Sequence, residues 1–532
     1  IQWLLALYDG QAVEFSVEEV EAGNTTLGHR FMAPDLIKIE DFAQYRQSLE
    51  EHYVIVDPVR RRNLVIDEVR KAVRDKVGED GTPVLHQGLI DTVTNLVEYP
   101  HGVCGSFAEK FLALPNEALV TSMREHQKYF PVVDNNGKLL PFFVAVNNTA
   151  IKDRELAASG HERVLRARLE DGLFFFNKDT QETLAGRMDA LSGIIFQKQL
   201  GTMADKSMRI AALSAYLAEL LEPSLQEDAV RAARLAKVDL LTEMVGEFPS
   251  LQGIIGCEYA LLDGEKSAVA KAIHEHYLPI RAGGKLPESL LGAIVGMADR
   301  VDTLVGCFAI GERPTGNKDA FGQRRLALGL IAIIRSRNLS LSLQDLLDKA
   351  LEGYAGRIDA QKDTLVDLLA FIRLRFENDL VAAGMKQEVV EAATSVGFDD
   401  LCDCLARIEA LQGIRSRDEF AVLAASFKRV RNIIKENRET VVDPALFSED
   451  AEQELFATLT AIRDQVHPLV RAKKYGDALI VLLTIKEPVD HFFDDVMVMA
   501  DDPAVRINRL NLLTALADLV LQIGDISRMH VE

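Results

Sequence analysis

The residues of this sequence best suited to chemistry are basic side chains spaced to meet successive phosphates. Arg124 and Lys128 are four residues apart, so on a helix they would be neighbours. Together they offer donors to the oxygen atoms of a phosphate backbone, and we expect them to contact RNA. The alternative is a solvated helix end that Tyr129 and Phe130 pack against the core.

A second basic segment spans residues 163–176, where arginines precede three consecutive phenylalanines. On a helix, Arg163 and Arg166 share a face and are predicted to follow a nucleic-acid backbone. In the alternative interpretation, the helix docks through its leucines and the arginines pair with Glu170 and Asp171.

Residues 311–325 combine a loop with the start of a basic helix. Their glycines and proline predict the loop, and Asp319 is suited to cap the helix that follows. The helix then opens with Arg324 and Arg325, which in an exposed position would contact RNA or a partner subunit. A plain connector between two helices explains the same residues.

The most specific basic pattern lies near the C-terminus. The three/four spacing places four cations on one helical face: Lys428, Arg431, Lys435 and Arg438. Farther along, Arg506, Asn508 and Arg509 open a long apolar helix. Cations, an amide and aromatic rings suit single-stranded RNA, whose unpaired bases stack on such groups. The alternative is a helical bundle in which the apolar residues of 489–499 are simply core.

Histidines and a carboxylate near position 300 raise the question of a metal site. The region of His274, His276 and Asp299 resembles part of the HD-type metal phosphohydrolases, whose adjacent His and Asp hold a metal and its water. No His-Asp dipeptide occurs in this sequence, and residues 243–249 stand where it is expected. We therefore expect no metal site, and we expect Asp299 and Arg300 to form a buried or interfacial pair.

Motifs for activating an amino acid or a nucleotide are missing. The sequence has no Gly-x-x-x-x-Gly-Lys-[Ser/Thr] loop, no Gly-x-Gly-x-x-Gly fingerprint and no Gly-x-Ser-x-Gly elbow. The adenylate-forming signatures His-x-Gly-His and Lys-Met-Ser-Lys-Ser are also missing. We expect neither a catalytic residue nor a cofactor of its own in this chain.

The composition restricts the type of protein further. A formal net charge of −21 argues against general nucleic-acid affinity, so the basic segments would have to act as local tracks. Five scattered cysteines indicate a reducing compartment, and with no leader and no membrane-spanning run we expect a cytoplasmic protein. The sequence opens without Met inside a strand-like run, so we expect an N-terminal piece to precede it.

Two kinds of element are expected to position these residues. Residues 1–170 mix short strands and helices, which predicts an α+β domain. Its expected strands are 54–56, 119–121, 129–133 and 141–146, with a hairpin turn at 134–137 and a helix at 57–76. Beyond residue 172 the apolar spacing predicts almost only helices, including 207–221, 226–245, 290–305, 319–335 and 365–383.

Four segments resemble, in order and spacing, the β subunit of bacterial two-subunit glycyl-tRNA synthetases: residues 124–130, 163–176, 298–321 and 489–513. The last segment, through Asp490, Phe492, Phe493 and the run 506–510, is also similar to the DALR-type anticodon-binding domain. This resemblance implies a multidomain fold. Its domains would be a B3/B4-like α+β domain at 1–170, an HD-like helical domain at 171–345, a helical connector at 346–400 and a DALR-type domain at 401–532.

The resemblance also implies partners. Glycine and ATP, with Mg, would be used on a separate α subunit in an α2β2 assembly, without DNA or membrane partners. This chain would bind glycine tRNA, position it and read its anticodon region, and the basic residues above would be its tRNA contacts. Two alternatives stay open: an HD-like nucleotide phosphohydrolase, which would copurify with metal, and a helical scaffold, which would not bind tRNA.

Overall fold

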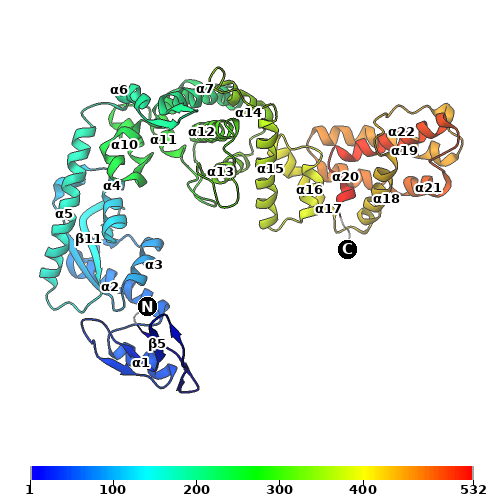
Figure 1. The fold of residues 1–532 in the computed structure, drawn as a ribbon. Coiled ribbons are helices and arrows are strands. Elements are labelled where there is room, and N and C mark those ends of the chain that lie inside the picture. Colours follow the sequence, from blue (N-terminus) through cyan, green and yellow to red (C-terminus); the bar gives the residue numbers. More distant parts are fainter. Residues whose placement is uncertain (1–2, 530–532) are drawn as a thin grey trace. The chain divides into compact units, whose positions relative to one another are not determined.

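The computed structural model describes residues 3–529, apart from the side chain of Asp418. The chain forms two compact units (Figure 1). The first contains the residues up to 187 together with 238–264, and the second contains 188–237 together with the residues from 265 onward. No helix within residues 3–529 has the length and apolarity needed to cross a bilayer.

The first unit begins with short strands around a small apolar core. Three of them form a sheet in the order β1-β5-β4 (Leu4–Leu5, Val20–Gly23, Ser16–Val17). Two further pairs are β2 with β3 (Leu7–Tyr8, Gln11–Ala12) and β6 with β7 (Thr25–Leu27, Leu36–Lys38). Ile37 and Ile39 pack with Leu49 of α1 (Phe42–Glu51).

A four-stranded antiparallel sheet forms the main core of this unit. Its order is β8-β10-β11-β9 (Thr82–Pro83, Phe130–Val133, Leu139–Asn147, His101–Ser106). Helices α2 (Pro58–Val77) and α3 (Gln87–Leu96) pack their valines against Phe130 and Val144. Asp57 caps α2, and proline occupies its first position, where no N–H is needed.

The predicted local structure of this unit is partly right. The helix at 57–76, the strands at 129–133 and 141–146 and the turn at 134–137 are confirmed, with Gly137 at φ +81°. The strand at 54–56 is wrong, because this segment is extended but joins no sheet. The strand at 119–121 is also wrong: it belongs to α4 (Asn116–Thr121), which starts after Pro115 at φ −52°.

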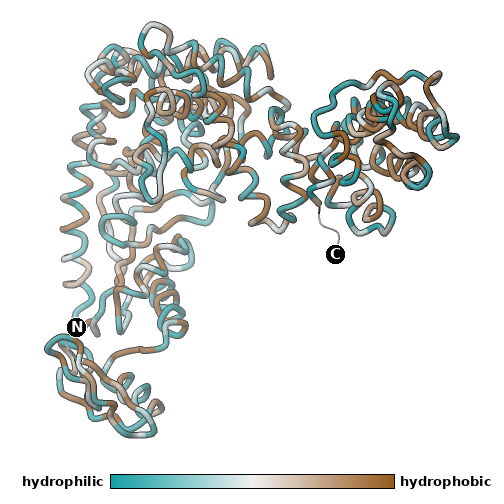
Figure 2. The backbone as a smooth tube through the Cα atoms, turned by 45° about the vertical axis from the view of Figure 1, so that its right-hand side comes forward, coloured by the Kyte–Doolittle hydropathy of each residue, from teal (hydrophilic) through white to brown (hydrophobic). Residues whose placement is uncertain are grey.

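Helix α5 (Arg154–Asp179) confirms the predicted helix at 163–176. Asp153 caps it, and Leu165, Leu169 and Gly172 are its buried face. Apolar and polar residues both occur along the whole helix (Figure 2), and apolar side chains such as Leu156 and Phe174 lie exposed on it. The unit is completed by α6 (Leu184–Arg187), α9 (Glu243–Glu247) and α10 (Ile254–Leu262).

Helices make up nearly all of the second unit, whose only described strands are β12 and β13 (Ile195–Gln197, Gly201–Thr202). Helix α12 (Leu290–Ala309) is buried along almost its entire length. Around it pack α7 (Met203–Leu221), α8 (Gln226–Leu235), α11 (Ser267–Glu275), α13 (Gln323–Ser336) and α14 (Leu343–Glu352). The predicted helix 226–245 is interrupted after Leu235, because Thr242 caps a new helix at Glu243.

The C-terminal part of this unit is a further set of helices: α15 (Thr364–Ala382), α16 (Gln387–Thr394), α17 (Leu401–Ile414), α18 (Asp418–Ile434), α19 (Asp450–Arg471), α20 (Tyr475–Leu483), α21 (Lys486–Asp495) and α22 (Pro503–Leu521). Helix α22 packs on α18 and α19. The prediction of a strand-containing N-terminal part followed by helices is thus confirmed.

Candidate nucleic-acid interface

The first predicted pair of cations lies on an irregular turn. Ser122–Gln127 form a π-helix, and Lys128 ends it at φ 58°. Arg124 pairs with Glu125 at 3.2 Å, while the Lys128 ammonium donates to the Glu125 carbonyl at 2.6 Å. The assumed α-helical spacing is therefore wrong. Because both cations already have local partners, the structure favours the packed helix end.

Arg163 and Arg166 lie exposed on α5. Neither has a carboxylate within ion-pair distance among residues 3–529, because Glu170 pairs instead with Lys110 at 2.6 Å. The next arginine, Arg168, differs from them, since it pairs with Glu247. The alternative of pairing with Glu170 is wrong, and two unpaired guanidinium groups on one helix can each meet a phosphate.

The loop before α13 separates the roles of Arg324 and Arg325. Asp319 accepts hydrogen bonds from the backbone N–H groups of Gln323 and Arg324, at 2.7 and 3.0 Å, so it caps the helix from within the loop. The guanidinium of Arg324 donates to the Gly316 carbonyl at 2.9 Å and thereby fixes the loop. Arg325 is exposed and has no ion pair within the part of the chain that the structure describes.

The basic face predicted for residues 428–438 is shorter than expected. Helix α18 ends at Ile434, and Lys435 has φ +47°, so only Lys428 and Arg431 share a helical face. Beyond the helix end, the Asn437 side chain donates to Asn511 and Thr514 of α22. Four cations of the segment are exposed: Lys428, Arg429, Lys435 and Arg438.

Asn508 and Arg509 hold the C-terminal helices together. The Asn508 side chain accepts from the N–H of Asp443 at 2.7 Å and donates to its carbonyl at 3.0 Å. Buried Arg509 binds both carboxylate oxygens of Glu452, at 2.9 and 3.0 Å, and also the Met497 carbonyl. Both side chains are buried and have partners within the chain, so the structure gives them a structural role, and their RNA contact stays a prediction. Arg506 is half-buried and donates to the Ala500 carbonyl at 3.1 Å.

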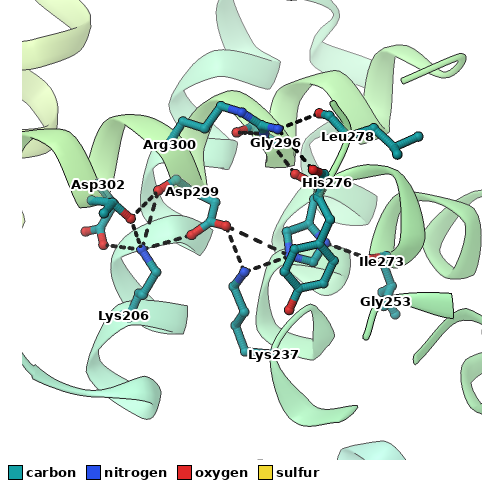
Figure 3. Close-up of polar contacts among 12 residues, drawn as sticks. Lys206, Lys237, Gly253, Ile273, His276, Leu278, Gly296, Asp299, Arg300 and Asp302 are labelled. Atoms are coloured by element: carbon teal, nitrogen blue, oxygen red, sulfur yellow. Dashed lines mark hydrogen bonds and ion pairs between the residues drawn. The ribbon is translucent and has the colours of Figure 1, made fainter. Parts of the chain in front are cut away.

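A dense polar cluster in the second unit, here called the buried ionic network, contains Lys206, Arg209, Lys237, His276, Asp299 and Asp302. Figure 3 labels all of these except Arg209. The Lys206 ammonium contacts Asp299 at 2.9 Å and Asp302 at 3.0 Å. Lys237 contacts Asp299 at 2.7 Å and the His276 ring nitrogen Nε2 at 2.9 Å. Arg209 donates to Asp302 at 2.6 Å.

This network explains the resemblance to a metal site without needing a metal. His276 and Asp299 lie 4.0 Å apart, and the Lys237 ammonium contacts both of them. Burial alone would raise the pKa of Asp299, yet Lys206 and Lys237 outweigh it and hold that pKa well below its usual range. Within residues 3–529, no group of three or more His, Cys, Asp or Glu side chains is arranged to hold a metal.

Asp299 and Arg300 are both largely buried, but they have different partners. The Arg300 guanidinium donates to the backbone carbonyls of His276, Gly296 and Leu278, at 2.9, 2.8 and 2.6 Å. Figure 3 shows Arg300 directed away from the carboxylate of Asp299. The predicted pair is thus corrected to two separate anchors on neighbouring positions of α12.

His276 gives the buried ionic network a predicted pH dependence. Burial, followed by the charge of Lys237, lowers the pKa of His276 well below its usual value. The unfolded chain then binds a proton below about pH 6.5 that the folded chain resists, so stability should fall as pH drops through that value. When the pH is lowered from 7.5 to 5.5, the free energy of unfolding in urea should fall by about 1.4 kcal/mol more in the wild type than in His276→Gln. Parallel losses in the two proteins would contradict this assignment.

Sequence reasoning overlooked the lysines and the arginine of the network. One signal was present: Lys206 and Arg209 are three residues apart in α7, on the same side as Ile210 and Leu213. Charged side chains on an apolar helical face require buried partners, and Asp299 and Asp302 on α12 supply them. Pairing those two helices from the sequence would have required knowledge of the tertiary fold.

Known proteins similar to this chain agree over its whole length. A family model described as glycyl-tRNA synthetase beta subunit matches residues 1–395, and a DALR anticodon binding domain model matches residues 423–526. The glycine–tRNA ligase beta subunit of Trichlorobacter lovleyi is 46% identical over 99% of this chain and 77% of its own length. That of Syntrophus aciditrophicus is 44% identical over 100% of this chain and 77% of its own length.

Proposed function

Since this chain belongs to the glycyl-tRNA synthetase β-subunit family, we propose that it acts as the tRNA-binding β subunit of a glycine–tRNA ligase. The observation that carries this proposal is the family match, which covers residues 1–395 and is followed by an anticodon-binding domain at 423–526. In this role the chain positions tRNA, and its C-terminal domain reads the anticodon region. Glycine and ATP, with Mg, are used on the α subunit of an α2β2 assembly in the cytoplasm.

Local cations in an acidic chain support tRNA binding. Arg163, Arg166, Arg325 and Lys428 are exposed and lack ion pairs among residues 3–529, while the formal net charge is −21. Local groups of free cations on a chain of net negative charge favour binding of one RNA over general polyanion binding. We also assign B3/B4-like character to the sheet of the first unit and HD-like character to the helices around α12.

The geometry disfavours the phosphohydrolase alternative. A nucleotide phosphohydrolase of the HD type needs a metal between His and Asp, where this chain has the Lys237 ammonium. A helical scaffold would not bind tRNA, so tRNA binding distinguishes it from the proposed function.

The decisive experiment is tRNA glycylation by the α subunit with and without this chain. We expect charging of glycine tRNA only when the chain is present, and no charging of a non-cognate tRNA. Charging that is unchanged by adding the folded chain would overturn the proposal. Binding of the same tRNA, measured in parallel, separates failure of assembly from failure of recognition.

Arg163 and Arg166 should each neutralise a tRNA phosphate. The double variant Arg163→Ala/Arg166→Ala is expected to weaken tRNA binding. Because about 0.7–0.9 counterions are released per phosphate contact, the slope of log K against log salt should fall by about 1.4–1.8. Filter binding from 50 to 200 mM salt measures this slope. Arg168→Ala is the matched control on the same helix, since Arg168 pairs with Glu247 and should leave the slope unchanged.

A further inference from the structure

A loop between α11 and α12, residues 279–286, is held rigidly at both ends. Before it, buried Arg300 donates to the carbonyls of His276 and Leu278 (Figure 3). After it, the Arg337 guanidinium donates to the Pro287 carbonyl at 2.9 Å. Within the loop, Gly283 adopts φ +67°, which favours glycine. The backbone on both sides of the loop is therefore anchored by arginine side chains from α12 and from the end of α13.

The loop faces α13 across a cavity of about 290 Å³, here called the α13 pocket. Its walls are mainly apolar, and the side chains that form them are Pro279, Leu286, Leu328 and Ala332. Gly329 also lines the pocket, and it lets α13 approach Arg300 closely, since a Cβ there would lie 2.7 Å from the Arg300 Nε. A cavity of this size, just below the usual range for drug-sized ligands, suits one planar group rather than a larger molecule.

Two arginines at the same pocket lack anionic partners. Arg281 and Arg325 both line it and are exposed, and neither forms an ion pair among residues 3–529. The carboxylate at the rim, Asp379, is already paired with Arg335 at 2.7 Å. Burial lowers the pKa of nearby Arg300 to about 10; Asp299 opposes this shift, and Arg325 adds a smaller lowering effect. The missing group at this pocket is therefore an anion.

We propose that the α13 pocket binds one splayed nucleotide of the tRNA, with its phosphate between Arg281 and Arg325 and its base against the apolar wall. The inference rests on the proposed function. Guanidinium groups form strong, charge-assisted hydrogen bonds with phosphate. Unstacked RNA bases can stack on apolar side chains and guanidinium groups. A continuous duplex offers no such unstacked bases. The combination of an apolar slot and two free cations matches a nucleotide better than a bare phosphate.

The test compares charge removal with pocket filling in the complex of this chain with the α subunit. Arg281→Ala/Arg325→Ala removes the phosphate contacts, and we expect tRNA affinity to fall about tenfold with a reduced salt slope. Ala332→Phe fills the slot from α13, and Ala282→Phe fills it from the exposed loop. We expect each to weaken tRNA binding about tenfold without changing the salt slope. Lys285→Ala is the matched control on the same loop, because Lys285 pairs with Glu288.

The outcomes separate this inference from the proposed function. Weakening by both charge removal and filling supports the nucleotide pocket. Weakening by charge removal alone would mean a surface phosphate contact and overturns it, as does unchanged tRNA binding in every variant. Variants that lose binding of free AMP but keep tRNA affinity would also overturn it, since the ligand would then be a free nucleotide. If the wild-type complex itself binds no tRNA, the proposed function has failed instead. The midpoint of urea unfolding confirms that each variant is folded.

Discussion

Replacing Asp302 by asparagine is expected to lower the free energy of unfolding of the second unit by about 3–5 kcal/mol. Asp302 is fully buried and faces two buried cations, Lys206 and Arg209. With its charge removed, Arg209 loses its only carboxylate among the described residues, and Lys206 keeps only Asp299. Burial works to lower the pKa of Lys206, but the charges of Asp299 and Asp302 outweigh it and raise that pKa. Without the charge of Asp302, keeping the buried ammonium of Lys206 charged costs free energy of folding.

Urea unfolding of the variant and of a matched control measures this loss. Asp367→Asn makes the same chemical change in an exposed pair, Arg313–Asp367, whose side chains are each 41% exposed. An exposed pair contributes about 0–1 kcal/mol, so the control should be nearly neutral. The double variant Asp302→Asn/Arg209→Leu should lose less than the sum of its single changes, because no guanidinium is left buried without a partner. Equal losses in Asp302→Asn and Asp367→Asn would contradict the prediction.

The sequence predicted helices well where the apolar spacing was long and regular. Helix α2 and helix α12 begin within one residue of the predicted positions because capping residues, Asp57 and Ser289, mark their starts. Short β-branched runs were less informative. Residues 119–121 have strand-like composition, but they follow Pro115 and are buried as one helical turn. A run this short has only a weak intrinsic preference for β-structure, so its tertiary contacts determine its conformation.

The candidate site was harder to predict, because a basic residue looks the same in sequence whether it binds RNA or another part of the chain. Arg163 and Arg509 both lie in segments that resemble the family, yet the first is exposed and the second is buried against Glu452. What distinguishes them is a partner 57 residues away in the chain. The end of α18 was missed for the same reason, since Asn437 finds its partners on α22.

The contact between Glu452 and Arg509 leads to the second large effect. Glu452→Gln should lower the free energy of unfolding by about 3–5 kcal/mol, because it leaves a guanidinium buried without a counter-charge. Burial alone would raise the pKa of Glu452, but hydrogen bonds from Arg509 and the backbone N–H groups of Ser448 and Glu449 outweigh it and lower that pKa. Glu454→Gln, two residues along α19, is the control, since its partner His491 is half exposed. Urea midpoints of the two variants measure the difference.

The same pair also tests whether Arg509 touches RNA. Replacing both members, as Glu452→Met/Arg509→Met, removes the charges together and should restore most of the stability lost in Glu452→Gln. If Arg509 only holds α19 to α22, tRNA binding by this double variant should stay within about threefold of wild type. A phosphate contact from Arg509 would instead weaken binding and reduce the salt slope by about 1. Stability and tRNA affinity are measured on the same double variant. A purely structural role of Arg509 predicts unchanged tRNA affinity, whereas a phosphate contact predicts weaker binding.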